Sequence, residues 1–433
     1  MLTAPPIDSA TTGVVRIELG APIPDIDDVP DLGARCLIQL DGRIITTVDL
    51  EPGTRSYSSE ELTARIAPAV VDALSRVAPE RRPTGWRELT PAGLGPRGVT
   101  PSTATRNLTV VIATRDRPES LLRCLMSVQA TVPPPKAVVV VDNAPSDRRT
   151  EEMLAETPGL ESVRYVLEPR RGLGRAHNAA LSLIDTEFVA FTDDDVVVDP
   201  TWVGSLADAF EAGDDVVCVT GLIAPLELRT REQWWMERSC GFAKGYERRI
   251  HSLGGQGSST LFPYDAGTFG SGANMAFRTS YLREVGGFDR SLGTGTRALG
   301  GDDLAALHGV VARGHQLVYE PAAVVLHRHH DALAALERQA YGYGAGLTAY
   351  LASVIAARPL AIVAIVRRVG AGARQLGSSR SPMNARRPGD YPARLVRRER
   401  LGMIAGPARY AWQRWVDRGE NGVPAVTAPG RNR

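Results

Sequence analysis

The stretch Glu187-Phe-Val-Ala-Phe-Thr-Asp-Asp-Asp195 joins a short apolar run to three consecutive aspartates. The apolar run is typical of a buried strand, and Val196-Val-Val-Asp-Pro200 follows directly, so apolar segments flank the acids on both sides. Three adjacent carboxylates repel one another, and such a cluster persists in a pocket only where a cation or several donors compensate it. We therefore expect a divalent metal here, although a solvated acidic turn is the commoner reading of such a run.

Short apolar runs alternate with amphipathic segments around this stretch, which is typical of an α/β fold with a parallel sheet. Three of the expected strands end in polar residues, namely Thr114-Arg115-Asp116-Arg117-Pro118, Asp142-Asn143 and the aspartates. Ligands of open parallel sheets bind beyond the carboxyl ends of the strands, so we expect these residues to meet at one edge. The expected strands cover 108–113, 137–141, 163–167 and 188–191, and the expected helices cover 118–130, 150–156 and 174–183.

The order of these motifs resembles the family 2 glycosyltransferases with the GT-A fold. The donor half of that family is similar to Val110-Val-Ile-Ala-Thr-Arg-Asp-Arg-Pro118, Val139-Val-Val-Asp-Asn143, Arg171-Gly-Leu-Gly-Arg-Ala-His-Asn178 and Phe191-Thr-Asp-Asp-Asp195. The acceptor half is similar to Gly270-Ser-Gly-Ala-Asn-Met-Ala-Phe-Arg278, Val285-Gly-Gly-Phe-Asp289, Gly300-Gly-Asp-Asp-Leu304 and His327. The resemblance covers residues 106–330, roughly half the chain.

This resemblance implies a Rossmann-like mixed sheet flanked by helices. It also implies an inverting, metal-dependent transfer of a sugar from a nucleotide-diphosphate-sugar to an acceptor hydroxyl, with Mn²⁺ or Mg²⁺ as cofactor. The acceptor would be a glycan, a lipid-linked molecule or a small molecule. The donor sugar, its base and the acceptor cannot be read from the sequence.

The roles of the donor-side residues are carried over from the family. Asp142 would accept hydrogen bonds from the base or ribose, and Asp193 and Asp195 would be the outer aspartates of the DxD motif. Asp195 is the first choice for metal contact, and His327 would be a third ligand unless it is a structural histidine. The implied donor-binding residues are Thr114, Arg115, Asp142, Arg171, Gly174, Arg175, Asn178, Asp193 and Asp194, and the implied metal ligands are Asp193, Asp195 and His327.

Asp302 and Asp303 occupy the place of the family's Glu-Asp pair. An inverting transfer needs a carboxylate that takes the proton of the acceptor hydroxyl, and the motif register implies Asp303 for this base, with Asp302 beside it. The alternative is a helix N-cap, since residues 304–312 are expected to be helical.

Aromatic residues between 230 and 269 are expected to stack on sugar rings, although core packing explains any one of them equally well. The acceptor-side residues implied are Trp234, Trp235, Gly272 and Asn274.

Residues 1–100 are expected to form a small α+β unit with a linker. The β-branched runs on either side of Asp41-Gly42 predict a hairpin, and Ser58 precedes an apolar-periodic run to Val77 that predicts a capped helix. Residues 79–101 are rich in Pro, Gly and Arg, as linkers are. We expect the catalytic domain over 101–335 and a helical, basic region over 336–433.

The formal net charge of +1 conceals an asymmetry, because residues 358–433 contain 16 Arg, no Lys and four acids. This charge favours an anionic partner, and an anionic membrane surface is preferred to nucleic acid because the region has no nucleic-acid motif. Residues 345–366 resemble a membrane span, but Arg358-Pro359 interrupts them. Four scattered cysteines and an N-terminus unlike a secretory signal predict a cytoplasmic protein, either free or peripheral on the inner membrane face.

Other functional classes would also use clustered aspartates on an α/β sheet. A nucleotidyltransferase would release pyrophosphate, and a metal-dependent phosphohydrolase is a further alternative. A non-catalytic nucleotide-sugar binding protein would bind the donor tightly without turnover.

Overall fold

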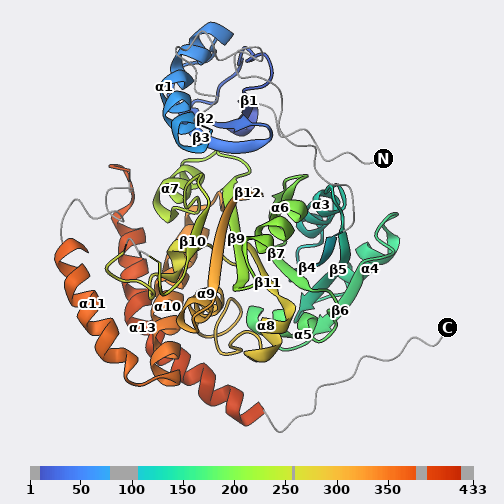
Figure 1. Cartoon of the computed structure of the whole chain (residues 1–433), viewed down its shortest axis with the longest axis vertical. Coiled ribbons are helices and arrows are strands. Elements are labelled where there is room, and N and C mark those ends of the chain that lie inside the picture. The colour runs from blue at the N-terminus through green and yellow to red at the C-terminus, as the bar shows by residue number, and fades with distance from the viewer. Residues whose placement is uncertain (1–9, 79–105, 256–258, 377–387, 421–433) are drawn as a thin grey trace.

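The computed structural model describes residues 10–78, 106–255, 259–376 and 388–420. A small N-terminal unit lies against a large central sheet, and long helices from the C-terminal region run along the outside of the molecule (Figure 1). The predicted linker at 79–101 and the last part of the basic region lie outside the described residues.

The N-terminal unit is a three-stranded sheet with one helix. Its strands are β1 (Val14–Glu18), β2 (Ala34–Leu40) and β3 (Arg43–Leu50), in the order β1-β2-β3. The predicted hairpin is confirmed, since Asp41 and Gly42 both have positive φ values, 53° and 79°. Helix α1 (Ser59–Val77) begins after Ser58, which forms a capping box with Glu61, as the sequence predicted.

The central sheet has nine strands among the described residues, in the order β10-β12-β9-β11-β7-β4-β5-β6, with β8 paired to β12. The strands β7, β4, β5 and β6 are mutually parallel, whereas β11 is antiparallel to both of its neighbours, so the sheet is mixed. The strands are β4 (Arg106–Thr114), β5 (Pro135–Asn143), β6 (Arg164–Glu168), β7 (Phe188–Asp193), β8 (Val196–Val198), β9 (Val216–Pro225), β10 (Arg249–His251), β11 (Asn274–Arg278) and β12 (Gln316–His327).

Helices cover both faces of this sheet. Apolar residues of α3 and α6 pack on one face, and those of α5, α8 and α9 pack on the other. The predicted strands and helices of the first half are present within two residues of their expected ends, and the α/β class is confirmed. The helices are α3 (Pro118–Gln129), α4 (Arg149–Glu156), α5 (Leu173–Leu181), α6 (Trp202–Ala209), α7 (Arg231–Cys240), α8 (Thr279–Glu284) and α9 (Asp302–Ala312).

The N-terminal unit shares an apolar cluster with the central sheet. Val14, Leu37 and Ile44 of the small sheet pack with Leu222 of β9 and Leu326 of β12. The Leu228 N–H donates to the Thr12 carbonyl at 2.8 Å, and Arg16 pairs with Asp199 at 3.3 Å. The unit is therefore packed onto the part of the chain that forms the central sheet.

The C-terminal region forms α10 (Leu333–Ala357), α11 (Ala361–Leu376) and α13 (Ala393–Glu420). The predicted interruption at Arg358-Pro359 is confirmed, because α10 ends at Ala357. Among the described residues, no helix is both long and apolar enough to cross a membrane.

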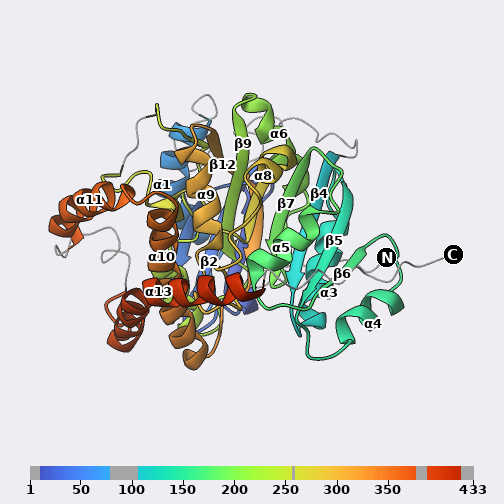
Figure 2. The ribbon, with the colours of Figure 1, turned by 90° about the horizontal axis from the view of Figure 1, so that it is seen from below.

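Helices α10 and α13 touch backbone to backbone, and α13 extends beneath the sheet toward α5 (Figure 2). A Cβ on Gly402 would clash with the Tyr341 carbonyl oxygen, and one on Gly406 would clash with the Ala345 carbonyl oxygen. Small residues at these positions let the two helices approach closely.

Replacing Gly402 by Ala should destabilise the protein, although Ala is the better helix former by about 1 kcal/mol. The added methyl group has no room beside α10, and overpacking of this kind costs roughly 1–3 kcal/mol. Gly419→Ala in the same helix is the control, since nothing lies within 4 Å of its Cβ position. Thermal unfolding should show a lower Tm for the first variant and an unchanged or slightly higher Tm for the second; equal Tm values would contradict the packing described.

Candidate active site and metal centre

Polar residues from four strands meet at one edge of the sheet. Thr114 ends β4, Asp142 lies at the end of β5, Asp193 ends β7 and His327 ends β12. The strands β4, β5 and β7 are parallel, and β12 is parallel to β9, which runs in the same direction as β7. The convergence expected from the sequence is therefore present.

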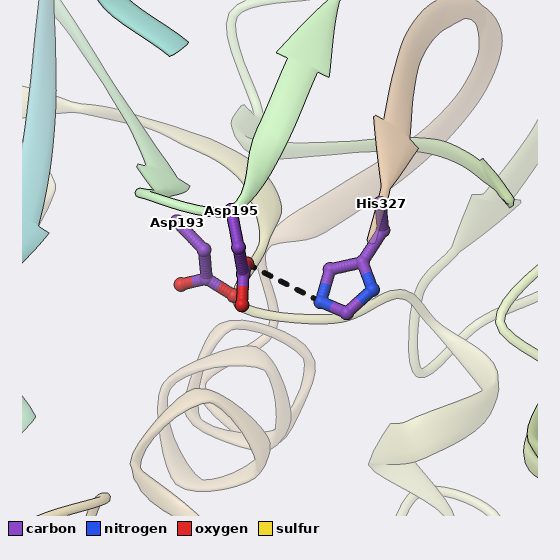
Figure 3. A group of neighbouring side chains, drawn as sticks. All are labelled: Asp193, Asp195 and His327. Atoms are coloured by element: carbon purple, nitrogen blue, oxygen red, sulfur yellow. Dashed lines mark ion pairs between the residues drawn. The ribbon is translucent and has the colours of Figure 1, made fainter. Parts of the chain in front are cut away.

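Three of these side chains form a possible metal centre. Asp193, Asp195 and His327 each offer a ligand atom, and these atoms lie within 4.8 Å of one another. The two carboxylates lie side by side, and the imidazole points toward them with Nε2 3.5 Å from Asp195 Oδ1 (Figure 3). Pairing of β12 with β8 sets this geometry, because His327 is opposite Val196, the residue that follows Asp195.

The chemistry of this group fits a divalent cation. Asp195 Oδ1 is buried and has no hydrogen-bond partner in the described part of the chain. Burial raises the pKa of Asp193 well above its usual value, and the charges of Asp195 and Asp194 raise it further, so the carboxylates lack compensation. Burial lowers the pKa of His327 to about 4, which leaves a neutral imidazole available as a ligand. Two carboxylates suit Mg²⁺ or Mn²⁺, and the imidazole suits Mn²⁺ better.

The central aspartate of the trio has protein partners of its own. Asp194 is buried, accepts a hydrogen bond from Thr114 Oγ1 at 2.7 Å and pairs with Arg117 Nη1 at 3.2 Å. The buried hydroxyl of Thr114 is therefore engaged within the acidic turn, and its predicted contact with the nucleotide stays a prediction. Burial nevertheless keeps the pKa of Asp194 raised.

Arg117 was missed in the sequence-based site. It lies 3.3 Å from Asp195 Oδ2 as well as beside Asp194, and its side chain is half-exposed. Its position immediately before Pro118, which opens α3 at the same sheet edge, is the signal that would have identified it. The guanidinium supplies positive charge next to the acidic cluster and keeps part of its surface open to solvent.

Asp142 lies at the end of β5. Tyr165 donates its hydroxyl hydrogen to Asp142 Oδ2 at 3.1 Å, whereas Oδ1 is buried without a partner in the described residues. Burial raises the pKa of Asp142 to about 6. Arg115, on the neighbouring loop, donates from Nε to the Ala144 carbonyl at 3.1 Å.

Arg171 lies just before α5, and Gly174 is the second residue of that helix. Arg171 is exposed on the loop before the helix. Gly174 lies under the Asp289 carbonyl oxygen, which would be 2.8 Å from a Cβ atom. Its small size is therefore required by packing, and the donor-binding reading of Gly174 is not supported.

Arg175 and Asn178 have structural partners as well. Arg175 is buried, and its Nη2 lies 2.6 Å from Asp417 Oδ1 of α13. Asn178 donates to the Phe288 carbonyl and accepts from the Phe288 N–H, both at 2.8 Å. These two side chains hold α13 and the loop at Phe288, and their predicted contact with the donor stays a prediction.

Asp302 and Asp303 are the first two residues of α9. The N-cap is Gly301, with φ 89°, so the expectation that an aspartate caps the helix is wrong. Asp303 is partly exposed and accepts hydrogen bonds from the Gly272 N–H at 3.0 Å and the Leu304 N–H at 2.8 Å. Asp302 is buried, and its Oδ2 has no hydrogen-bond partner in the described residues. Burial is the main cause of its raised pKa, and the charge of Asp303 is the second.

The acid pair Asp302 and Asp303 acts electrostatically on Asp193 of the possible metal centre. The charges of Asp303 and Asp302 both contribute to the raised pKa of Asp193. Strand β11 sets this approach, because Asn274 pairs with Thr192 and brings Gly272 beside the end of β7. The two sets of carboxylates therefore lie within electrostatic reach of each other.

Three of the four residues implied for the acceptor side are buried. Trp234 and Trp235 are only 6% and 8% exposed and pack in apolar clusters, so they belong to the core. Asn274 is fully buried, and its amide bonds to Trp202 and to two backbone carbonyls. These three residues cannot line an acceptor site, whereas Gly272 remains next to the acid pair.

Comparisons with known proteins agree with this sheet and its motifs. Residues 109–286 match the model of glycosyl transferase family 2. Pre-mycofactocin glycosyltransferase of Mycobacterium tuberculosis is 28% identical over 275 residues, which cover 63% of this chain and 50% of that protein. Glucosyl-dolichyl phosphate glucuronosyltransferase of Haloferax volcanii is 27% identical over 190 residues, 43% of this chain and 57% of that protein. The chain thus spans about half the length of the curated relatives it matches.

Solved structures with some similarity include the mannosyltransferase PcManGT from Pyrobaculum calidifontis in complex with GDP-Man and Mn²⁺. It has a TM-score of 0.42 and 19% identity, over 77% of this chain and 80% of that one. GalNAc-T7 with UDP, GalNAc and Mn²⁺ has a TM-score of 0.39 and 15% identity, over 58% of this chain and 51% of that one.

Replacing Asp142 by Asn should stabilise the protein above about pH 6. The pKa of Asp142 is raised from 3.8 to about 6 in the folded state, so the folded state binds the proton more tightly than the unfolded state does. The wild type therefore loses stability as the pH rises from 3.8 to about 6, whereas the uncharged Asn does not. The gain in Tm should be a few degrees at about pH 7.5 and smaller at about pH 5. Asp147→Asn is the control: its exposed carboxylate has a lowered pKa beside Arg149, so no gain is expected. A pH-independent gain for Asp142→Asn would contradict the cause given.

Proposed function

The chain belongs to the family 2 glycosyltransferases through residues 109–286, and we propose that it transfers a sugar, with inversion, from a nucleotide-diphosphate-sugar to an acceptor hydroxyl. The observation that carries this proposal is the grouping of Asp193, Asp195 and His327 at the sheet edge that also holds Asp142. A nucleotide-diphosphate-sugar needs a hydrogen-bonding group for its nucleoside and positive charge for its diphosphate. Asp142 offers the first, and a cation held by Asp193, Asp195 and His327 would supply the second.

Asp142 would hold the nucleoside, because its buried Oδ1, which has no hydrogen-bond partner among the described residues, could accept from an N–H or O–H of the base or ribose. Asp193, Asp195 and His327 would hold Mn²⁺ or Mg²⁺, which neutralises the diphosphate leaving group when bound. Arg117, half-exposed beside Asp195, would add a cationic contact for the phosphates.

Asp303 would act as the catalytic base. Its two oxygens each accept a backbone N–H, which fixes the carboxylate beside Gly272 and leaves its remaining lone pairs for an acceptor hydroxyl. As the acceptor oxygen bonds to the anomeric carbon, its proton passes to Asp303, and the nucleoside diphosphate leaves from the opposite face. Asp302 is the less suitable base of the two, because it is buried and its pKa is raised, first by burial and then by the charge of Asp303.

Asp303→Asn should lower kcat by roughly 10²–10⁴-fold, because the amide cannot take the proton, while the KM for the donor changes only a few-fold. Release of nucleoside diphosphate and formation of glycosylated acceptor measure the effect. Asp185→Asn, at an exposed carboxylate away from the site, should keep full activity. Undiminished kcat in folded Asp303→Asn would refute the assigned base.

The products separate this proposal from its alternatives. A nucleotidyltransferase using the same acids would release pyrophosphate, whereas the proposed reaction releases a nucleoside diphosphate. A binding protein would hold the donor without releasing either product. The stereochemistry at the anomeric carbon, read by NMR of the product, tests inversion directly.

We also propose that the C-terminal helices contact an anionic membrane surface. Leu360 is 85% exposed and Val366 is 63% exposed, and Ile362 and Val363 beside them are exposed as well. Exposed arginines at 358 and 367 flank this apolar stripe, which begins at Leu360, directly before α11, and continues into the helix. A basic, amphipathic helix of this kind binds by burying its apolar face among lipid headgroups. The relative from Haloferax volcanii is named for glucosyl-dolichyl phosphate, and a lipid-linked acceptor would be presented at such a surface.

Val366→Asp should weaken binding to vesicles rich in phosphatidylglycerol by roughly tenfold, because it removes buried apolar area and adds a negative charge. Leu183→Asp is the matched control, since Leu183 is 45% exposed on the catalytic body. Flotation of the full chain with vesicles measures binding, and added salt should weaken it. Equal flotation of the two variants would rule out this helix as the contact.

A further inference from the structure

A continuous row of polar side chains connects the N-terminal sheet to the metal centre. Arg35 of β2 pairs with Glu237 of α7, Nη1 to Oε1, at 2.5 Å. Glu237 Oε2 lies 2.8 Å from Nε2 of His329, and Nδ1 of His329 lies 3.2 Å from Nδ1 of His327. The row ends where His327 Nε2 faces Asp195 at 3.5 Å.

This row is shielded from water. The side chains of Glu237 and His329 are 6% and 0% exposed, and Phe242 lies against both imidazoles at ring distances of 5.4 and 5.6 Å. Arg35 is also mostly buried and pairs with Asp49 at 2.7 Å. Buried charges and polar groups need partners, so loss of one member leaves its neighbours without compensation.

The hydrogen bonds set the direction in which His327 offers its lone pair. An ionised Glu237 only accepts, so His329 Nε2 must donate to it. Two Nδ1 atoms at 3.2 Å can share one proton between them. In the tautomer that carries the proton of His329 on Nε2, Nδ1 of His329 accepts from His327 Nδ1–H, and the lone pair of His327 is then on Nε2, toward Asp195. A metal ion binds only such a lone pair, and hydrogen bonds at the other ring nitrogen commonly fix this tautomer.

We propose that Arg35 is a positioning residue for the metal centre, which acts through Glu237 and His329 to hold His327 with Nε2 toward Asp193 and Asp195. The N-terminal sheet is thereby a working part of the catalytic site. This inference rests on the proposed function in one respect, that a divalent cation binds to Asp193, Asp195 and His327.

The test is the affinity of the full chain for Mn²⁺ alone, measured by the EPR signal of free Mn²⁺. Arg35→Gln and Glu237→Gln should weaken binding by on the order of 10–100-fold, the usual effect of removing such a supporting contact. Arg35→Lys keeps the charge and should restore part of the affinity. A merely structural role for Arg35 would lower the Tm and leave the Mn²⁺ affinity of the folded protein unchanged.

Arg238→Gln is the matched control. Arg238 also pairs with Asp49, at 3.3 Å, and lies over the Trp234 ring as Arg35 does, but it has no hydrogen bond or ion pair with Glu237 in the described part of the chain. Its Mn²⁺ affinity should stay within twofold of the wild type. An effect as large as that of Arg35→Gln would overturn the proposed route through Glu237.

Two further variants separate this inference from the proposed function. If Asp195→Asn and His327→Gln bind Mn²⁺ as the wild type does, or if the wild type binds none, the metal centre itself is refuted. If both lose Mn²⁺ while folded Arg35→Gln and Glu237→Gln keep wild-type affinity, only the positioning role is refuted. If Arg35→Gln does not fold, Glu237→Gln, which preserves the side-chain shape, decides the question.

Discussion

The arrangement of the site depends on negative charge that is concentrated at one edge of the sheet. Six carboxylates gather there, those of Asp142, Asp193, Asp194, Asp195, Asp302 and Asp303, and their compensation differs. Asp194 has Thr114 and Arg117, and Asp303 has two backbone N–H groups. Asp195 keeps a buried oxygen without a hydrogen-bond partner in the described residues. Because carboxylates so close together cannot all ionise without cations, this difference supports the separate roles proposed for Asp195, as a metal ligand, and for Asp303, as the base.

The two appended regions support opposite sides of this edge. On the side of the base, Gly301 packs against Gly346 of α10, directly before Asp302. Helix α13 holds the loop before it, since Gln413 accepts from the Arg297 N–H at 3.0 Å. On the side of the metal, the small sheet reaches His327 through α7. Neither region contributes a group to the proposed chemistry, yet each positions an element that does.

The sheet edge could be predicted from sequence because local pattern determines it. An apolar run that ends in Thr114, Asp142 or Asp193 marks the carboxyl end of a strand, and parallel strands align those ends. Some residues of the predicted site have partners far along the chain that the sequence did not reveal. Arg175 meets Asp417, 242 positions away, and Trp234 is buried partly by the N-terminal sheet. No local periodicity shows such contacts, so a motif match alone could not distinguish a donor ligand from a packing residue.

The polar row from Arg35 to His327 is not the kind of contact expected if the N-terminal sheet were joined to the central sheet for stability alone. Val14, Leu37 and Ile44 dock the same small sheet by apolar contact, which stabilises without the desolvation cost of charged groups. Buried ion pairs contribute little to stability on balance, and apolar residues of similar size often replace them without loss. An ion pair that joins two units and continues by hydrogen bonds to a metal-facing imidazole is therefore better explained by orientation than by stability. On this reasoning the proposed role of the N-terminal unit is to set the direction in which His327 presents its nitrogen, and its apolar contacts hold Arg35 in place.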